Sequence, residues 1–176
     1  NRQFFTEKQI GKSKAEALAE NIKAINSKIN IRCTNATVEA LDEDYDFTSA
    51  EWYFDCLDNI PTRKFLNHFC VKNKKKLIHG GTNPENSEVQ VIIPQKTACL
   101  QCTPYPEEAK ATKQSCADFD AAICTTNGIT TCLMVDAFMD YLFERENRKP
   151  WISYIRSKGT FYRDVKRNDK CEVCGR

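Results

Sequence analysis

The chain has 176 residues, of which 41% are hydrophobic and 28% charged, a composition that suits one globular domain and excludes an intrinsically disordered chain. Its 26 basic and 24 acidic residues give a formal net charge of +2, which lacks the strongly basic character typical of nucleic-acid-binding or membrane-surface domains. No apolar stretch is long enough to cross a bilayer and the N-terminus lacks a secretory signal core, so we expect a cytoplasmic protein, or a nuclear one if it is eukaryotic.

The first half of the chain alternates between helix and strand patterns. Apolar residues at helical spacing predict an amphipathic helix over residues 12–27. Residues 29–38 alternate in strand fashion, and residues 52–57 form a short apolar run typical of a buried strand. Pro61 stands where the first position of a helix is expected, so we predict a second helix from that residue.

The second half is richer in strand patterns and contains the most apolar helix, predicted over residues 127–144. A polar, irregular segment over residues 99–120 precedes this helix. The predicted strands cover residues 76–79, 89–94, 151–156 and 160–165. Alternating helices and strands followed by a β-rich end predict an α/β fold with a mixed sheet.

Two Cys-x-x-Cys pairs form the strongest local signal in the sequence. Cys99 and Cys102 form one pair, and Cys171 and Cys174 form the other. Two intervening residues let both thiolates of a pair face one metal ion, and two pairs complete the tetrahedral shell of a structural zinc site. The alternative is two disulfides or four free thiols. We predict a Zn²⁺ that ties the end of the chain to the loop after residues 89–94.

Cations at the start of the first predicted helix indicate phosphate binding. Lys12 and Lys14 lie where the helix dipole already creates a positive potential. They are favourable there if an anion such as a nucleotide phosphate binds, because helix N-termini bind phosphates. Alternatively, both side chains extend into water. Arg2 adds a planar donor group that suits phosphate oxygens.

Asp58 and Asn59 directly follow the predicted strand over residues 52–57. Ligands of open α/β sheets bind at the carboxyl ends of strands, where an aspartate can hold a Mg²⁺ that bridges phosphates. Alternatively, Asp58 or Asn59 only caps the helix that follows. Arg63 either orients the aspartate or forms a surface pair.

The two histidines give no support to other chemistry. His68 lies on a predicted helix and His79 ends a predicted strand. Neither has ligand-like neighbours in the sequence, so we expect an ordinary structural or surface role for both. A histidine-based nucleophile relay or a catalytic zinc site therefore has no support in the sequence.

Short motifs along nearly the whole chain resemble those of the ubiquitin-activating, MoeB and ThiF superfamily. In family order they are Asn1-Arg2-Gln3-Phe4-Phe5, Ile10-Gly11-Lys12-Ser13-Lys14-Ala15, Asp58-Asn59 with Arg63, Gly80-Gly81-Thr82, Thr97-Ala98-Cys99-Leu100-Gln101-Cys102, Thr125-Thr126-Asn127-Gly128 and the final Cys-x-x-Cys. Each motif alone is weak, but the ordered set is specific. The resemblance implies a Rossmann-like mixed sheet flanked by helices, forming a single ThiF-type adenylation domain over residues 1–176.

Members of this superfamily use ATP to adenylate the C-terminal glycine of a ubiquitin-like protein, and many then transfer the acyl group to a cysteine. The resemblance implies that Arg2 and Gln3 bind the nucleotide, with Arg2 reaching the triphosphate, often across a dimer interface. It also implies that Lys14 binds phosphate, and that Asp58, accompanied by Asn59, binds Mg²⁺ and the nucleotide. Such catalysis depends on aligning and neutralising anions and requires no general base.

Members that form a thioester often carry the acceptor cysteine at the position of Cys116, between the first zinc pair and the helix over residues 127–144. Cys124, beside the start of that helix, is the second candidate, because a helix N-terminus stabilises a thiolate. Alternatively, either cysteine is only a packed thiol. We expect the remaining cysteines, which fall inside predicted strands and helices, to be core residues: Cys33, Cys56, Cys70 and Cys132.

The sequence departs from the superfamily pattern at the nucleotide loop. Residues 1–176 contain no Gly-x-Gly-x-x-Gly turn, so we expect the nucleotide-binding βαβ portion to be absent from this chain and supplied by preceding residues or by another chain. The implied partners are a ubiquitin-like or sulfur-carrier protein, an identical or related second subunit, and a downstream conjugating enzyme. The alternative functions are a sulfur-carrier adenylyltransferase of the MoeB/ThiF type and a non-catalytic scaffold subunit.

Overall fold

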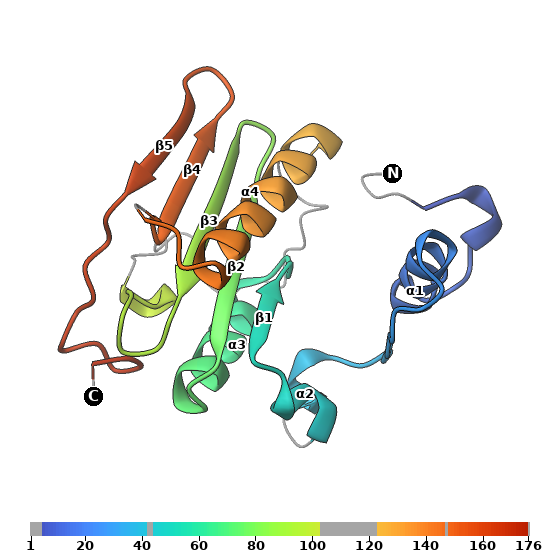
Figure 1. Cartoon of the computed structure of the whole chain (residues 1–176), viewed down its shortest axis with the longest axis horizontal. Helices are drawn as coiled ribbons and strands as arrows, with labels where there is room; N and C mark the ends of the chain where they lie inside the picture. Colours follow the sequence, from blue (N-terminus) through green and yellow to red (C-terminus); the bar gives the residue numbers. More distant parts are fainter. Residues whose placement is uncertain (1–4, 42–43, 103–122, 147, 176) are drawn as a thin grey trace.

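A five-stranded mixed sheet forms the centre of the protein in a computed structural model that describes residues 5–41, 44–102, 123–146 and 148–175 (Figure 1). Its strands are β1 (Trp52–Asp55), β2 (Lys76–Thr82), β3 (Asn86–Ile92), β4 (Trp151–Ile155) and β5 (Gly159–Arg163), in that spatial order. β1 and β2 run parallel, and the remaining neighbours pair antiparallel. The α/β fold with a mixed sheet predicted from the sequence is confirmed.

Four α-helices accompany the sheet in the described part of the chain. They are α1 (Lys14–Ile25), α2 (Tyr45–Ser49), α3 (Ile60–Lys72) and α4 (Cys124–Leu142). The side chains of Ser13, Asp44 and Asn59 cap the first three helices by accepting a backbone N–H each. The short helix α2 was not predicted, because its five residues give no helical periodicity to detect.

Helices cover both faces of the sheet, as the alternating side chains of β2 show. Leu77 packs with the α3 residues Leu66 and Phe69, whereas Ile78 packs with the α4 residues Met134 and Ala137. Because successive side chains of a strand point to opposite faces, α3 and α4 lie on opposite sides of the sheet. Burial on both faces explains why the neighbouring residues Leu77 and Ile78 are both apolar, where a strand with one exposed face would alternate.

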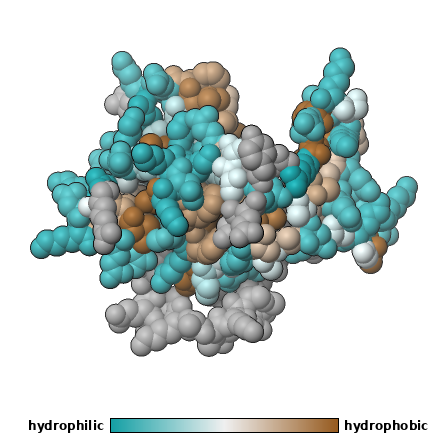
Figure 2. Space-filling model, turned by 90° about the horizontal axis from the view of Figure 1, so that it is seen from below, coloured by the Kyte–Doolittle hydropathy of each residue, from teal (hydrophilic) through white to brown (hydrophobic). Residues whose placement is uncertain are grey.

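The N-terminal portion with α1 lies apart from this sandwich (Figure 1). The helix itself is as predicted, but its apolar face is largely uncovered, with Leu18 51% and Ile25 88% exposed. Figure 2 shows hydrophobic atoms on the surface of this portion, at the right of the view. Helix formation here therefore follows local spacing and capping, without the core packing that an amphipathic pattern usually indicates.

The predicted strand over residues 29–38 is wrong. Residues 29–37 form no strand, and a short 3₁₀ helix covers Val38–Leu41. An alternating segment becomes a strand only by hydrogen bonding to a neighbouring strand. In the described part of the chain no strand forms a ladder with these residues, so the alternating pattern does not become a strand. None of the described helices is both long and apolar enough to cross a membrane.

Candidate functional site

The parallel strands β1 and β2 end on the side of the sheet at which α4 begins (Figure 1). The last residue of β1, Asp55, lies opposite His79, while β2 continues to Thr82. The Thr82 hydroxyl donates to Asn127 Oδ1 over 3.0 Å, which ties the end of β2 to the first turns of α4. We call this region the carboxyl edge: Asp55, residues 57–59, residues 79–82 and the start of α4. In open α/β sheets ligands bind at such an edge.

A buried pair formed by Asp55 and His79 lies at the carboxyl edge. Asp55 Oδ2 is 2.6 Å from His79 Nδ1, and the two side chains are 0% and 8% exposed. The other carboxylate oxygen, Asp55 Oδ1, accepts the backbone N–H of Leu57 over 2.9 Å. The sequence analysis missed this pair, because Asp55 was read as part of an apolar strand. The parallel register of β1 and β2 brings the two residues together, and that register could not be read from the sequence.

Arg63, in the first turn of α3, binds the backbone of the same edge. Its Nε donates to the Leu57 carbonyl over 2.9 Å, its Nη2 donates to the same oxygen, and Nη2 also reaches the Gly80 carbonyl at 3.4 Å. Neither sequence interpretation of Arg63 holds, since it neither orients Asp58 nor forms a surface ion pair among the described residues. It fixes the loop after β1 against β2.

Asp58 and Asn59 follow β1 as predicted, but they differ in role. Asn59 is the N-cap of α3, where its Oδ1 accepts the Thr62 backbone N–H over 2.9 Å. Asp58 is exposed, and its Oδ1 accepts only a long hydrogen bond of 3.4 Å from Asn59 Nδ2 among the described contacts. The Asp58 carboxylate is therefore available at the carboxyl edge, beside the positive N-terminal end of α3.

The structure does not bring the predicted phosphate-binding lysines to this edge. Lys14 begins α1, which lies apart from the sheet (Figure 1), and Lys12 forms an ion pair with Glu20 at 2.7 Å. This pair lowers the pKa of Glu20, first through the hydrogen bond from Lys12. The remaining predicted site residues, Arg2, Gln3 and Cys116, lie outside the described residues.

The four predicted metal-binding cysteines form one cluster at the other end of the sheet. Their sulfur atoms all lie within 4.8 Å of one another, and neighbouring sulfurs are 3.3 Å (Cys102 to Cys174), 3.7 Å (Cys99 to Cys171) and 4.0 Å (Cys99 to Cys102) apart. A tetrahedral zinc with Zn–S bonds of about 2.3 Å places its sulfurs about 3.8 Å apart, so the residues fit that metal. Disulfides would need about 2.05 Å, which excludes that alternative here.

The surroundings of the cluster favour the thiolate form of one member, Cys171. Burial opposes ionisation of Cys171, but hydrogen bonds from the backbone of Cys174 and Val173 and from the neighbouring thiols outweigh it and lower its pKa to about 7. Burial raises the pKa of Cys99 and of Cys174. Because zinc coordinates thiolates, the members that are protonated release their protons on binding the metal.

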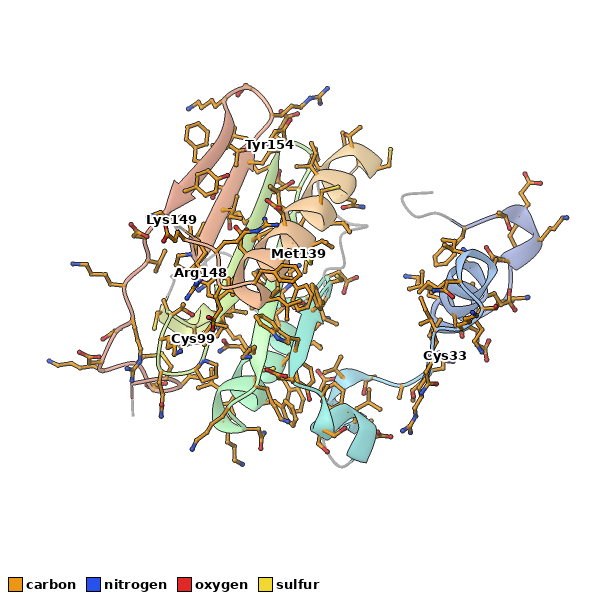
Figure 3. The ribbon with its side chains drawn as sticks, viewed as in Figure 1. Cys33, Cys99, Met139, Arg148, Lys149 and Tyr154 are labelled. Atoms are coloured by element: carbon orange, nitrogen blue, oxygen red, sulfur yellow. The ribbon has the colours of Figure 1, made fainter. Side chains whose placement is uncertain are left out.

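Backbone geometry holds the C-terminal pair of cysteines in place. The Gly175 N–H donates to the Cys171 carbonyl over 2.8 Å, and a Cβ at Gly175 would lie 2.5 Å from that oxygen, so only glycine fits the turn. Arg167 Nε and Nη2 donate to the Cys174 carbonyl over 2.9 and 2.6 Å. Figure 3 shows Cys99 in the loop after β3, at the end of the sheet where the C-terminal segment returns.

The other cysteines differ from expectation. Cys70 is fully buried as predicted, but Cys33, Cys56 and Cys132 are exposed. Cys33 follows α1 and lies far from the sheet (Figure 3), because the strand predicted to contain it does not form. Cys124, the first residue of α4, is exposed at the carboxyl edge. The N-cap residue of α4, Ile123, makes no side-chain cap hydrogen bond, and the N-terminal end of the helix carries a positive potential at this edge.

Comparison with known protein families identifies the fold. The sequence model of the ThiF family matches residues 1–173. The chain belongs to the ThiF family. Its relatives in that family include proteins called ubiquitin-like modifier-activating enzyme 5. The protein from Drosophila virilis is 28% identical over 194 residues, covering 98% of this chain and 48% of its own length. The one from Dictyostelium discoideum is 26% identical over 193 residues, with 97% and 50% covered.

This ThiF-family chain thus spans about half the length of those relatives. Solved structures of the same fold include E. coli MccB with AMPCPP and MccA, which has a TM-score of 0.79 and 16% identity and covers 98% of this chain and 54% of MccB. A structure of MccB with ATP has a TM-score of 0.73, 16% identity and coverage of 98% and 54%. At such low identity the likeness shows the ThiF-type fold alone.

Proposed function

We propose that this chain is the adenylation domain, over residues 1–176, of an enzyme that activates a ubiquitin-like modifier. The modifier's C-terminal carboxylate attacks the α-phosphorus of ATP, forming an acyl-adenylate and releasing pyrophosphate. The thiolate of a cysteine then attacks the acyl carbon, forming a thioester and releasing AMP. The observation that carries the proposal is the ThiF-family match over residues 1–173. The names of the relatives, which are modifier-activating enzymes, support the choice of substrate class.

Two features of the carboxyl edge support this proposal. We propose that Asp58 holds a Mg²⁺ that bridges phosphates, and Asn59, the N-cap of α3, fixes the start of that helix beside it. The N-termini of α3 and α4 add positive potential, which favours two anionic reactants meeting at one place. When bound, Mg²⁺ neutralises phosphate charge and helps pyrophosphate to leave.

Lys14 and Arg2 are proposed to bind the triphosphate, with Gln3 beside them. Because α1 lies apart from the sheet, Lys14 serves this role only where α1 meets a carboxyl edge, in this chain or across a homodimer or heterodimer. The adenine would be bound by a glycine-rich turn, which residues 1–176 lack. Zinc at the four cysteines has a structural role, because a closed shell of four thiolates leaves no open position for a reactant.

Pyrophosphate exchange tests the proposal. The protein, with any partner subunit, should incorporate labelled pyrophosphate into ATP only when the modifier is present. Asp58→Asn should lower the exchange rate by about 100-fold, the size of effect expected when one electrostatic contact to a transition state is lost. Asp136→Asn, on the exposed face of α4, is the matched control and should leave the rate unchanged. Exchange that does not depend on the modifier would reject the proposal.

The separation of Lys14 from Asp58 favours one alternative, a scaffold subunit that supports a catalytic partner chain. In that case Asp58→Asn and Lys14→Ala would both leave the exchange rate of the complex unchanged. The product distinguishes a third function, that of a sulfur-carrier adenylyltransferase, since its modifier ends as a thiocarboxylate and forms no cysteine adduct. For the activating enzyme we propose a cytoplasmic location and a downstream conjugating enzyme that accepts the thioester.

A further inference from the structure

The backbone of Leu57, the residue before Asp58, is held at both of its polar groups. The Leu57 carbonyl accepts Arg63 Nε over 2.9 Å and also accepts Arg63 Nη2. The Leu57 N–H donates to Asp55 Oδ1 over 2.9 Å. Because a peptide unit is planar, fixing the Leu57 carbonyl fixes the plane that contains the Asp58 backbone nitrogen. Arg63 therefore acts on Asp58 through the backbone, without a contact to its side chain among the described residues.

The two side chains that hold Leu57 are themselves fixed. Asp55 is fully buried at the end of β1, and its Oδ2 lies 2.6 Å from Nδ1 of His79 on β2. Arg63 lies in the first turn of α3, and its Nη2 also reaches the Gly80 carbonyl of β2 at 3.4 Å. These contacts join the loop after β1 to both the strand β2 and the helix α3.

The backbone after Asp58 is fixed as well. Asn59 caps α3: its Oδ1 accepts the Thr62 N–H over 2.9 Å, and its carbonyl accepts the Arg63 N–H over 3.2 Å. The Asp58 side chain, in contrast, is exposed and accepts only the 3.4 Å bond from Asn59 Nδ2 among the described contacts. The fixed backbone on both sides thus holds in place one carboxylate whose oxygens keep most of their bonding capacity for a ligand.

This arrangement suits a carboxylate that is placed for a ligand. Asn59 caps α3 through its own side chain, so the cap alone does not account for the bonds that Asp55 and Arg63 make to the loop. Mg²⁺ takes oxygen ligands, usually with one or two carboxylates, and the exposed Asp58 fits that requirement. We propose that Asp55 and Arg63 are positioning residues for Asp58: by holding the loop backbone before it, they place its carboxylate to meet a divalent cation. The inference rests on the proposed function, in which Mg²⁺ reaches the carboxyl edge together with ATP.

Pyrophosphate exchange measured over a range of Mg²⁺ concentrations tests the role of Arg63. Arg63→Met keeps an unbranched side chain of similar length but donates no hydrogen bond to the Leu57 carbonyl. We expect it to raise the Mg²⁺ concentration for half-maximal exchange by about tenfold or more, the effect typical of losing a residue that orients a metal ligand. Arg63→Lys keeps the charge and one donor, so it should recover part of this loss.

The matched control is Lys64→Met, which removes an exposed cation from the next position of α3. It should leave the Mg²⁺ dependence unchanged. Thermal unfolding shows how well each variant folds. If Arg63 has a structural role alone, Arg63→Met lowers the Tm and the amount of active enzyme but keeps the wild-type Mg²⁺ dependence, and that result would overturn the proposal.

Cation binding can also be measured without turnover, with Mn²⁺ as the probe for NMR on the full chain or complex. Bound Mn²⁺ broadens nearby signals, and the Asn59 side-chain amide lies 3.4 Å from Asp58 Oδ1. In the wild-type protein and in Lys64→Met this signal should broaden at Mn²⁺ concentrations about tenfold lower than in Arg63→Met or Asp58→Asn. Equal broadening in all four proteins means that Arg63 does not position a cation ligand.

Hydrogen exchange of the wild-type protein gives a readout that does not depend on how the variants fold. The Leu57 N–H lies in the loop after β1, yet its bond to the buried Asp55 should slow its exchange with solvent. The Asp58 N–H, which has no partner in the described part of the chain, is the reference and should exchange faster. Equally fast exchange of the two amides would show that the loop is not held, and the inference would then be wrong.

The outcomes separate this inference from the proposed function. Suppose that Mn²⁺ broadening follows the expected order but no modifier-dependent exchange occurs: the proposed function then fails, and the positioning of Asp58 stands. Suppose instead that exchange occurs and depends on Asp58, while Arg63→Met and Lys64→Met both keep the wild-type Mg²⁺ dependence: the inference then fails alone.

Discussion

Cys102 Sγ lies 3.3 Å from Cys174 Sγ although 72 positions separate the two residues in the chain. Together with Cys99 and Cys171, these two cysteines form a cluster whose size suits one zinc ion. We predict about one zinc per chain in purified protein. Cys174→Ser should lose the metal and lower the free energy of unfolding by about 3 kcal/mol or more, which corresponds to about 10 °C in Tm for a domain of this size.

Metal analysis and thermal unfolding check this prediction. Cys33→Ser is the control, because Cys33 is exposed in the segment after α1 and far from the cluster (Figure 3). It should change neither the zinc content nor the Tm. Protein that is free of metal and has the same Tm before and after treatment with a chelator would contradict a structural zinc site.

Gly80 lies where side chains of α4 pack directly against β2. A Cβ at Gly80 would lie 2.4 Å from Met134 Sδ and 3.2 Å from Thr130 Cγ2. We predict that Gly80→Ala lowers the free energy of unfolding by about 1–3 kcal/mol, because overpacking forces side chains out of their preferred rotamers. Urea unfolding measures this, with Gly128→Ala as the control, which should be neutral or stabilising by up to about 1 kcal/mol.

A double mutant shows whether Met134 is the cause. Met134→Ala alone should cost about 2–5 kcal/mol through the cavity that it leaves. The double mutant Gly80→Ala/Met134→Ala should lose less free energy of unfolding than the sum of the losses of the two single mutants, because the new methyl group then has room. Strict additivity would show that Gly80→Ala acts through the backbone and not through this contact.

Cys70 should make the fold sensitive to alkali. The side chain is 0% exposed, and desolvation raises its pKa from the ordinary 9.0 to about 12. Below pH 9 the thiol is protonated in both states and contributes no pH dependence. As the pH rises from 9 towards 12 only the unfolded state ionises, so the free energy of unfolding should fall by about 1.4 kcal/mol per pH unit from this group.

Unfolding in urea between pH 9 and pH 10 measures this effect as a difference between proteins, because Cys56, Cys99, Cys174 and Tyr53, whose pKa values burial also raises, add to the slope in all of them. Cys70→Ala leaves a cavity and so lowers stability at neutral pH as well, which makes the slope the relevant readout. The slope should become shallower in Cys70→Ala and stay unchanged in Cys33→Ala. Equal slopes in all three proteins would contradict a buried, protonated thiol.

The sequence was informative where structure depends on local pattern. The Cys-x-x-Cys spacing led to the four-cysteine cluster, and Pro61 marked the first turn of α3. Apolar runs located the strands of the sheet to within a few residues, though β2 extends to Thr82 because its end pairs with Ser87 in the antiparallel hairpin to β3. Each of these features arises from residues close together in the chain.

Features that depend on distant pairing were not predictable in the same way. Residues 29–38 carry a strand pattern, but a strand also needs a neighbour, and the pattern contains no information about one. The Asp55 and His79 pair depends on the parallel register of β1 and β2, which brings together two residues that are 24 positions apart in the chain. A charged residue at the end of an otherwise apolar strand was the one signal that could have indicated it.

Cys124 and Cys116 remain the candidates for a thioester, and substitution distinguishes them. Cys124 is exposed where α4 begins at the carboxyl edge, whereas Cys116 lies outside the described residues and is chosen by family resemblance. We predict that, with ATP and the modifier present, wild-type protein forms an adduct of the modifier that a thiol reductant removes, as expected of a thioester. Cys116→Ala should abolish this adduct and Cys124→Ala should keep it.

Non-reducing gels and intact-mass measurement detect the adduct, and pyrophosphate exchange shows that adenylation survives each substitution. Cys132→Ala is the control, because Cys132 is also exposed on α4 but lies eight residues beyond the first residue of the helix, away from its N-terminal N–H groups. An adduct that persists in Cys116→Ala and disappears in Cys124→Ala would move the acceptor to the start of α4, where backbone N–H groups stabilise the attacking thiolate. An adduct that persists in both variants would show that neither cysteine is the acceptor. A variant that loses pyrophosphate exchange as well as the adduct would show that its substituted cysteine is needed before the transfer step.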